Sequence, residues 1–460
     1  MDQTAEALTR FASELRYQDL TPGAIHAAKR SLIDSIGCAF GAFHAAPSKA
    51  MRNLASQVTA TQPATVIGTQ IRSSPELAAI ANGAMIRYLD FSDDYFGGKG
   101  DIGPHPSDNI CGVMAAAESA GADGRALILG MTIAYEACAQ ITDKVDFGGV
   151  KPTWDYPVLH AIATSLGAGK VLGLSHEQIR DALALAAVSN ITLLQTRVGE
   201  LSNWKGMAGP NGSRNGLFAA MLAKQGITGP EDPFEGKAGW MKHLGMPFEL
   251  GPLGGGATPF KIEGTFYKFI PIRYSAQLMV WIALELRRKV MVQDIASICV
   301  YVPKRYVSSI ANYPEYWNPT TRETVDHSFP FLIGAALIDG EINDRTFTPE
   351  CFRDPAILAL TGKITMAEDP DFSADFPRHY NCRFEVTMKS GDVVSVHQAN
   401  PKGHPANPMS DREIEEKFIR QADVVSVPKA QSRALLCALW KLEEQGDIAS
   451  LFPLMRLPGA

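Results

Sequence analysis

Small and apolar residues fill most of the first 260 positions, in runs that short polar stretches interrupt. Along residues 25–40 the apolar side chains recur three and four positions apart, which places them on one face of a helix. Thr21-Pro22 has the pattern of an N-cap followed by proline at the first helical position, and Ser175 is a similar start further on. The same spacing predicts helices at 77–86, 110–120, 126–142, 159–172 and 179–187. Because almost nothing here alternates with period two, we expect residues 1–262 to form an all-helical domain.

The pattern changes after the glycine-rich segment 253–257, which is a candidate hinge. Beyond it, several short runs alternate between apolar and polar residues, which is the pattern of half-buried strands. Two of them flank Ser390-Gly391-Asp392, a turn sequence typical of a β-hairpin. The predicted strands are 298–302, 363–367, 383–388 and 393–397, and a helix is predicted at 277–286. We therefore expect a smaller α+β lid domain over residues 263–398.

The last part of the chain returns to a helical pattern, with predicted helices at 411–418 and 431–445. We expect residues 399–460 to pack back on the first domain, which makes that domain discontinuous. The expected fold class is mainly α: a large all-helical domain completed by the C-terminus, plus a smaller α+β lid domain.

Composition and charge narrow the functional classes. The 460 residues are 46% hydrophobic and 20% charged, which is the composition of an ordinary soluble globular protein. With a net charge of −6, nothing in the sequence favours binding to nucleic acid or to an anionic membrane. No uninterrupted apolar run reaches the ~18 residues of a transmembrane helix. The seven cysteines are scattered without the spacing of a metal or redox motif, so we expect a cytoplasmic protein.

One polar stretch, residues 88–109, stands between two alanine-rich predicted helices. It carries three carboxylates close together, and such crowding should raise the pKa of at least one of them unless a cation intervenes. These carboxylates belong to Asp90, Asp93 and Asp94. Lys99 and His105 could supply the compensating charge. The alternative is a solvated loop with an aspartate cap for the second helix, and composition alone favours neither interpretation.

A second polar cluster lies at 195–206, again between predicted helices rich in small residues. Lys205, beside Trp204 and Gly206, is expected to be partly desolvated and able to act as an acid or a base. The alternative is a lysine at a helix start, with its aliphatic stem on apolar surface and its ammonium group in water.

The third stretch, residues 316–330, also combines cations with small polar residues. Arg322 can bind a carboxylate through two parallel hydrogen bonds. His327, beside Asp326, could be an oriented base. We favour the structural alternative, in which residues 326–328 cap an apolar helix that follows them.

The fourth stretch, residues 267–277, places Lys268 and Arg273 where they could bind an anionic substrate between the domains. The sequence lacks a glycine-rich nucleotide motif, a cysteine cluster and a nucleophile elbow. No cluster offers more than one histidine, and none offers paired metal ligands, so we expect no metal. Several cations beside a histidine and a carboxylate suit proton abstraction next to a carboxylate of a polycarboxylic acid.

These motifs resemble those of the MmgE/PrpD family, which includes 2-methylcitrate dehydratases, cis-aconitate decarboxylases and an iminodisuccinate epimerase. The resemblance covers nearly the whole chain. It is carried by Tyr88-Leu89-Asp90-Phe91, His105-Pro106-Ser107-Asp108-Asn109, Gln195-Thr196-Arg197-Val198-Gly199-Glu200-Leu201-Ser202, Trp204-Lys205-Gly206, Trp317-Asn318-Pro319, Thr321-Arg322-Glu323-Thr324, Asp326-His327-Ser328 and Lys402-Gly403-His404-Pro405. The resemblance implies a helical domain with an α+β lid, no cofactor, a small di- or tricarboxylate substrate and a homodimer.

The resemblance places three residues at active-site positions of the family, namely Asp90, His105 and Lys205, and it places Lys268 in the matching segment at the start of the lid. The departures from the family pattern are Asp94 where many relatives have threonine, and Tyr156 and Ser275 where histidine is expected. Two lost imidazoles remove two proton carriers, although a tyrosine can still donate a proton.

We expect a metal-independent hydro-lyase that acts on a methylcitrate-like tricarboxylate. His105 abstracts the proton, Asp90 orients it, and Lys205 protonates the leaving hydroxyl or stabilises the enolate-like charge. Tyr156 is the fourth candidate catalytic residue, and we expect Asp90, His105 and Lys205 to converge on one pocket. The expected substrate-binding residues are Asp94, Lys268, Arg273, Ser275 and Arg322.

Two alternatives stand beside this hypothesis. One is an epimerase or decarboxylase of a related polycarboxylate, because Tyr156 opposite a lysine would suit proton transfer on two faces of a substrate. The other is a non-catalytic relative that binds a ligand or serves as a scaffold, which the three departures from the family pattern motivate.

Overall fold

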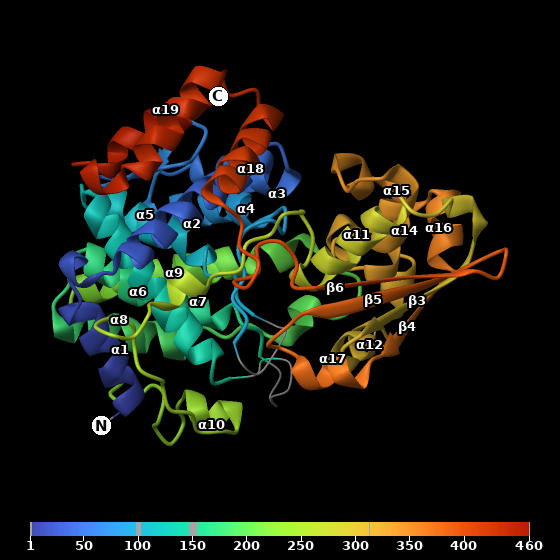
Figure 1. Cartoon of the computed structure of the whole chain (residues 1–460). Helices are drawn as coiled ribbons and strands as arrows, with labels where there is room; N and C mark the ends of the chain where they lie inside the picture. The colour runs from blue at the N-terminus through green and yellow to red at the C-terminus, as the bar shows by residue number, and fades with distance from the viewer. Residues whose placement is uncertain (1, 98–102, 146, 148–153, 312, 460) are drawn as a thin grey trace. The chain divides into compact units, whose positions relative to one another are not determined.

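The computed structural model describes residues 2–97, 103–145, 147, 154–311 and 313–459. It is mainly helical with a small mixed sheet, which confirms the expected fold class (Figure 1). Lys99 lies outside the described residues. The chain divides into a helical unit, made of Met1–Leu194, Gly206–Phe266 and Ser410–Ala460, and a mixed unit, made of Gln195–Lys205 and Tyr267–Met409. The domain boundaries expected from the sequence stay a prediction.

Helices form nearly all of the regular structure described in the helical unit. They are α1 (Gln3–Glu14), α2 (Pro22–Gly41), α3 (Ala46–Ala55), α4 (Pro75–Arg87), α5 (Asp108–Ser119), α6 (Gly124–Thr142), α7 (Val158–Val171), α8 (His176–Ser189), α9 (Ala208–Lys224), α10 (Trp240–Leu244), α18 (Asp411–Val424), α19 (Lys429–Trp440) and α20 (Phe452–Met455). Each helix predicted in this unit overlaps one of these, although α18 continues to Val424 beyond the predicted end at 418, and the predicted helix 431–445 ends as the separate 3-10 helix Leu442–Glu444. Two short strands, β1 (Ala64–Thr65) and β2 (Arg72–Ser73), pair as a two-residue antiparallel ladder. None of the helices in the described part of the chain has both the length and the hydrophobicity needed to cross a bilayer.

Local capping explains where two of these helices begin. The backbone N–H of Ala24 donates to Oγ1 of Thr21 at 3.0 Å, directly before α2. Ser175 and Gln178 form a capping box at the start of α8, in which each side chain accepts from the other residue's backbone N–H. Each cap satisfies N–H groups that the helix itself leaves without an acceptor, and this stabilises the helix by roughly 1 kcal/mol.

The small residues of the helical unit allow its helices to approach each other closely. A Cβ placed on Gly167 in α7 would lie 2.4 Å from the carbonyl oxygen of Gly130 in α6. A Cβ on Gly37 in α2 would lie 3.1 Å from Cα of Phe418 in α18. The high glycine and alanine content therefore serves backbone-to-backbone packing.

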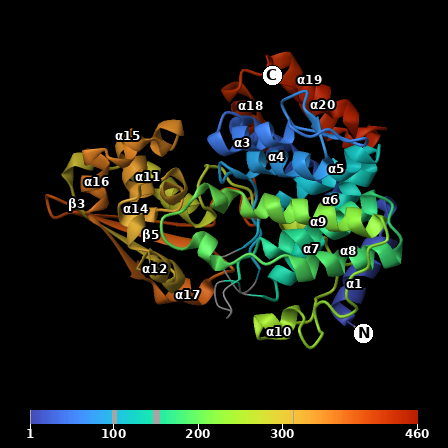
Figure 2. The same cartoon turned by 180° about the vertical axis from the view of Figure 1, so that it is seen from behind.

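The C-terminal helices pack on helices from the first part of the chain (Figure 2). A buried ion pair fixes α18 against α2, because Nζ of Lys417 lies 2.7 Å from Oδ1 of Asp34. The same ammonium donates to the carbonyl oxygen of Phe91 at 2.6 Å and lies over the Phe91 ring. Both charged side chains are almost completely buried.

The mixed unit contains a four-stranded sheet in the order β4-β3-β5-β6, with β3 and β4 parallel and the other pairs antiparallel. Its elements are α11 (Tyr274–Leu286), β3 (Ile295–Val302), α12 (Lys304–Ala311), α13 (Arg322–Val325), α14 (Phe329–Asp339), α15 (Pro349–Phe352), α16 (Pro355–Thr361), β4 (Ile364–Glu368), α17 (Pro370–Asp375), β5 (Asn381–Met388) and β6 (Val393–Ala399). All four predicted strands and the predicted hairpin are confirmed. Ile298, Val300 and Val302 are buried, as their alternation predicts.

Replacing Lys417 by methionine should destabilise the helical unit by about 3–5 kcal/mol, because the buried Asp34 carboxylate would lose the ammonium group that lies 2.7 Å from it. Urea unfolding measures this change. The matched control is Lys429→Met, at an exposed lysine of α19 that forms no ion pair with a described residue.

The double variant Asp34→Leu/Lys417→Met should recover most of the lost stability, since it removes both charges. Equal stability of Lys417→Met and Lys429→Met would contradict the role assigned to this ion pair.

Candidate active site

The polar stretch between α4 and α5 folds back into the helical unit. The backbones of Asp94 and Phe266 exchange two hydrogen bonds, of 2.8 and 2.9 Å. The backbone N–H of Ser107 donates to Oδ1 of Asp93 at 3.0 Å. Asp90, in the left-handed region with φ 52°, is only 1% exposed. The interpretation of this stretch as a solvated loop is therefore wrong for the part that the structure describes.

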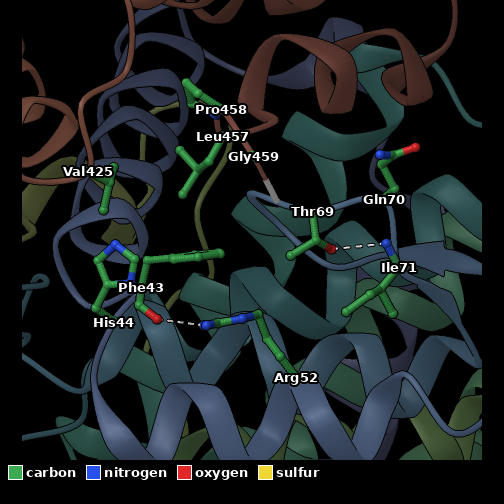
Figure 3. Close-up of a pocket in the computed structure, with 10 residues that line it drawn as sticks. All are labelled: Phe43, His44, Arg52, Thr69, Gln70, Ile71, Val425, Leu457, Pro458 and Gly459. Atoms are coloured by element: carbon green, nitrogen blue, oxygen red, sulfur yellow. Dashed lines mark hydrogen bonds between the residues drawn. The ribbon is translucent and has the colours of Figure 1, made fainter.

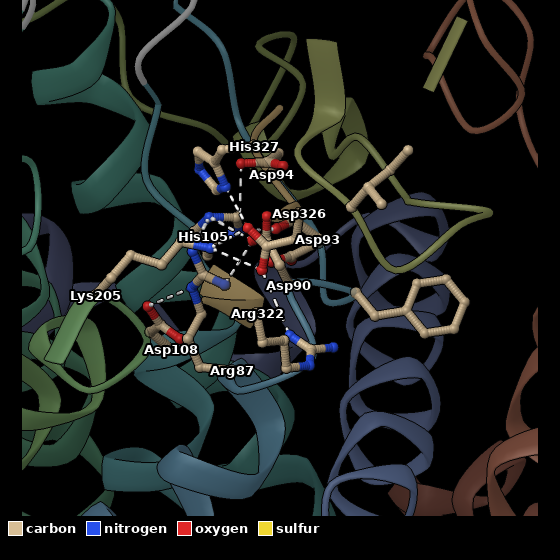
Figure 4. Close-up of polar contacts among 12 residues, drawn as sticks. Arg87, Asp90, Asp93, Asp94, His105, Asp108, Lys205, Arg322, Asp326 and His327 are labelled. Carbon is tan, nitrogen blue, oxygen red and sulfur yellow. Dashed lines mark hydrogen bonds and ion pairs between the residues drawn. The ribbon is translucent and has the colours of Figure 1, made fainter. Parts of the chain in front are cut away.

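A buried arginine at the end of α4 lies at the centre of the polar residues (Figure 4). Arg87 donates through Nη1 to Oδ1 of Asp90 at 2.6 Å. Its Nη2 lies 2.7 Å from Nε2 of His105 and 3.5 Å from the hydroxyl of Tyr156. Burial opposes the charge, but Asp90, Tyr156 and Asp108 outweigh it and raise the pKa of Arg87. We call Arg87, Asp90, His105, Tyr156 and Asp108 the Arg87 cluster.

The contacts of His105 define which ring nitrogen carries the proton. A guanidinium can only donate, so Nε2 of His105 must accept from Arg87. Nδ1 then carries the hydrogen, and it donates to the carbonyl oxygen of Asp93 at 2.5 Å, with Oδ1 of Asp94 at 3.2 Å. His105 is therefore a neutral imidazole whose lone pair points at a cation and whose N–H faces a carboxylate.

The fold changes the titration of the Asp93 carboxyl group. Burial raises the pKa of Asp93 to about 6, against hydrogen bonds from Ser107 and from the hydroxyl of Tyr135 at 2.7 Å that act in the opposite direction. The sequence predicted a raised pKa among the crowded carboxylates, and this is confirmed. The main cause is burial rather than the repulsion that the sequence suggested.

A second layer of polar side chains supports the Arg87 cluster. Nε of Arg87 lies 3.9 Å from Oδ2 of Asp108, and Nε2 of His160 lies 3.5 Å from the same oxygen. The Tyr156 ring contacts both imidazoles edge-on, at 5.9 Å from His105 and 6.0 Å from His160 between ring centres. A Cβ on Gly209 would lie 1.9 Å from Oδ2 of Asp108, so only glycine fits there.

In the mixed unit, the predicted cations gather on one buried carboxylate, that of Asp326. Nζ of Lys205 lies 3.1 and 3.3 Å from its two oxygens, and Nη1 of Arg322 lies 3.4 Å from Oδ2. His327 forms a short contact with the same carboxylate through Nδ1. Because Lys205 is 2% exposed and paired, the alternative of an ammonium group in water is wrong. The ion pair favours the charged form of this lysine.

The other predicted cation and hydroxyl positions also lie in the mixed unit. The backbone N–H of Arg273 donates to the carbonyl oxygen of Asp326 at 2.9 Å, and its guanidinium lies over the Phe329 ring. Lys268 is 1% exposed, and Ser275 is buried in the first turn of α11. Ser328 caps α14 by accepting from the backbone N–H of Phe331, so the structural role favoured for residues 326–328 is confirmed at this residue.

The structure thus brings Asp90, Asp94, His105 and Tyr156 together in the helical unit, and it gathers Lys205, Arg322 and the backbone of Arg273 around Asp326 in the mixed unit. The convergence of Asp90 and His105 with Lys205 stays a prediction. Sequence reasoning missed Arg87, which connects the residues of its cluster. Its signal was a lone charge ending an alanine-rich helix, three residues before Asp90.

Comparisons with known proteins give a consistent result. The MmgE/PrpD N-terminal domain matches residues 6–252, and the MmgE/PrpD C-terminal domain matches residues 271–442. A 2-methylcitrate dehydratase of Cupriavidus necator is 27% identical over 455 residues, which cover 92% of this chain and 90% of the relative. A cis-aconitate decarboxylase of Homo sapiens is 26% identical over 465 residues, which cover 96% and 92%. A 2-methylcitrate dehydratase of Salmonella typhimurium is 26% identical over 385 residues, which cover 79% and 77%.

Replacing Asp93 by asparagine should change how stability depends on pH. The pKa of Asp93 is about 6 in the folded protein, and an unfolded aspartate titrates near ~3.9. Its protonation therefore stabilises the fold fully below about pH 4, and this contribution is lost as the pH rises through about 6. The free energy of unfolding of the wild type minus that of Asp93→Asn should fall by up to ~3 kcal/mol between about pH 4 and pH 7.

Urea unfolding at several pH values measures this difference, with the exposed Asp371→Asn as the control. A difference that stays constant with pH would show that Asp93 does not titrate in this range.

Proposed function

Because the chain belongs to the MmgE/PrpD family, we propose that it is a metal-independent lyase of a small di- or tricarboxylate. Its reaction is like that of a 2-methylcitrate dehydratase: removal of a proton next to a carboxylate and loss of water. The observation that carries the proposal is the environment of His105, whose ring nitrogens face Arg87 on one side and the Asp93 carbonyl and Asp94 on the other.

His105 is the proposed base, acting through Nε2. A substrate carboxylate attracts the guanidinium of Arg87, and the Nε2 lone pair then becomes available for the proton of the adjacent carbon. The imidazolium that forms keeps its Nδ1 hydrogen on the Asp93 carbonyl, and the Asp94 carboxylate at 3.2 Å stabilises the new positive charge. Asp90 keeps its position through Arg87 and orients the site.

The electron pair left on carbon expels the hydroxyl group of the substrate. Lys205 protonates this hydroxyl so that it leaves as water, or stabilises the enolate-like charge on the carboxylate. Its ion pair with Asp326 keeps the ammonium protonated, which supports the second of these roles, stabilisation of the negative charge. The proposed ligands of the substrate carboxylates and hydroxyl are Asp94, Lys268, Arg273, Ser275 and Arg322.

A second candidate is an epimerase or a decarboxylase of a related polycarboxylate. The observation that favours it is the hydroxyl of Tyr156, a proton donor 3.5 Å from Nη2 of Arg87 on a ring packed edge-on against His105. A base and an acid in contact with one guanidinium would allow one group to take a proton and the other to return one.

His105→Ala should abolish proton exchange at the substrate carbon while the protein stays folded. NMR in deuterated water with citrate, 2-methylcitrate, cis-aconitate and iminodisuccinate distinguishes dehydration, decarboxylation and solvent exchange without net change. We expect dehydration of 2-methylcitrate by the wild type, and a loss of at least ~100-fold in His105→Ala.

The control is His26→Ala, which removes an exposed histidine of the same unit. Undiminished exchange in His105→Ala would contradict the assignment of the base. Absence of turnover and exchange across the panel would favour a non-catalytic relative.

Activity should be unchanged after dialysis against EDTA. A metal bound to Nε2 of His105 would have to displace the cationic guanidinium of Arg87, and Nδ1 carries a hydrogen. The same NMR assay measures the activity before and after chelation. Loss of activity that a divalent ion restores would show that the metal-independent mechanism is wrong.

A further inference from the structure

A cavity of about 560 Å³ lies in the helical unit and shares no residue with the Arg87 cluster (Figure 3). Its walls are mainly apolar and come from separate parts of the chain. They include Phe43, Ile71, Val425 and Leu457. A cavity of this size accommodates a small organic molecule.

One charged side chain that lines this cavity is buried. Arg52 in α3 is 8% exposed, and its Cζ lies 3.7 Å from the centre of the Phe43 ring. Nη1 of Arg52 donates to the carbonyl oxygen of Phe43 at 2.6 Å and contacts Sδ of Met85 at 3.6 Å. These contacts hold the guanidinium in one orientation at the cavity wall.

The charge of Arg52 lacks the compensation that two other buried cations, Arg87 and Lys417, have. Arg87 and Lys417 each lie within 2.7 Å of an aspartate oxygen. No carboxylate in the described part of the chain lies at ion-pair distance from Arg52. Burial lowers the pKa of Arg52, but an arginine remains charged at neutral pH. A buried cation without a counter-ion is unfavourable, and an anionic ligand would remove that cost.

One edge of the Arg52 guanidinium is available to bind a carboxylate. Its contacts with described residues use Nη1, so Nε and Nη2 have no acceptor among them. These two nitrogens form the edge that binds a carboxylate through parallel hydrogen bonds. Thr69 and Gln70 are two other polar residues that line the cavity. The hydroxyl of Thr69 already forms two hydrogen bonds, since it donates to the carbonyl oxygen of Val66 and accepts from the backbone N–H of Ile71. The exposed amide of Gln70 has no hydrogen-bond partner among the described residues.

We propose that this cavity is a second binding site, for a small monocarboxylate with an apolar body. The carboxylate pairs with Nε and Nη2 of Arg52, and the apolar body packs against Phe43, Ile71 and Leu457. One guanidinium balances one carboxylate. A phosphate dianion would leave oxygens against apolar walls without donors, so the same geometry disfavours it.

Calorimetric titration of the whole protein with hexanoate tests the site. Hexanamide, which has the same body without charge, and inorganic phosphate, which has charge without the body, are the comparison ligands. We expect each of these to bind at least ~10-fold more weakly than hexanoate, because hexanamide lacks the charge that pairs with Arg52 and phosphate lacks the apolar body.

Arg52→Met should weaken hexanoate binding at least ~10-fold. Arg72→Met, the same substitution at an exposed position outside the cavity lining, should leave it unchanged. Because Arg52→Met also removes buried contacts, Gln70→Glu provides an independent variant. It keeps those contacts, places a carboxylate at the cavity, and should also weaken hexanoate binding.

Hexanoate could also bind at the proposed active site. Titration of the His105→Ala variant distinguishes binding there from binding in the cavity. Binding that is lost in His105→Ala and retained in Arg52→Met and Gln70→Glu would overturn the proposal and leave the proposed function untouched. Equal binding of hexanamide would reduce the cavity to an apolar pocket, and equal binding of phosphate would reduce it to an ion site. No binding of hexanoate to the wild type would also overturn it.

Discussion

The guanidinium of Arg87 has to be balanced inside the helical unit, and the arrangement around it follows from that requirement. Taking a cation of this size out of water costs several kcal/mol unless anions accompany it. Asp90 supplies the close ion pair and Asp108 a more distant one, so two carboxylates belong there for an electrostatic reason. The turn after α4 and the start of α5 must therefore lie close together, and His105 is positioned between them. Asp90 makes its ion pair with Arg87 from a backbone with a positive φ of 52°, in the turn after α4.

Much of the fold could be predicted because its signals are local. The period of the apolar residues located the helices, and Thr21 and Ser175 marked two of their starts through the hydrogen bonds that they make. The alternation in 298–302 and the turn at 390–392 located the strands in the same way. Pairing across long separations carries no local signal. The order of the sheet, with β3 parallel to β4 although the two are far apart in sequence, could not be predicted.

The types of residue in the site could be predicted from the sequence, but the contacts between them could not. The motifs drew attention to Asp90, His105 and Lys205 because polar residues between apolar helices are conspicuous. Arg87 was not conspicuous, since an arginine in the last turn of a helix has an ordinary role near the negative end of the helix dipole. The sequence favours a helix-cap role for residues 326–328, yet the carboxylate of Asp326 contacts Lys205, Arg322 and His327. Burial of the side chain distinguishes a residue of the site from a residue that only begins or ends a helix, and burial cannot be read from a single sequence.

Two of the three departures from the family pattern, Asp94 and Tyr156, lie close to His105. Asp94 stands where the resemblance implies threonine, and its carboxylate lies 3.2 Å from Nδ1. A carboxylate there stabilises an imidazolium more than a hydroxyl would. Tyr156 stands where the resemblance implies histidine, and it contributes a neutral hydroxyl beside the same guanidinium. A second imidazole could compete for the proton, whereas a tyrosine at neutral pH can only donate one. Both changes are consistent with the proton transfer that we propose for this chain.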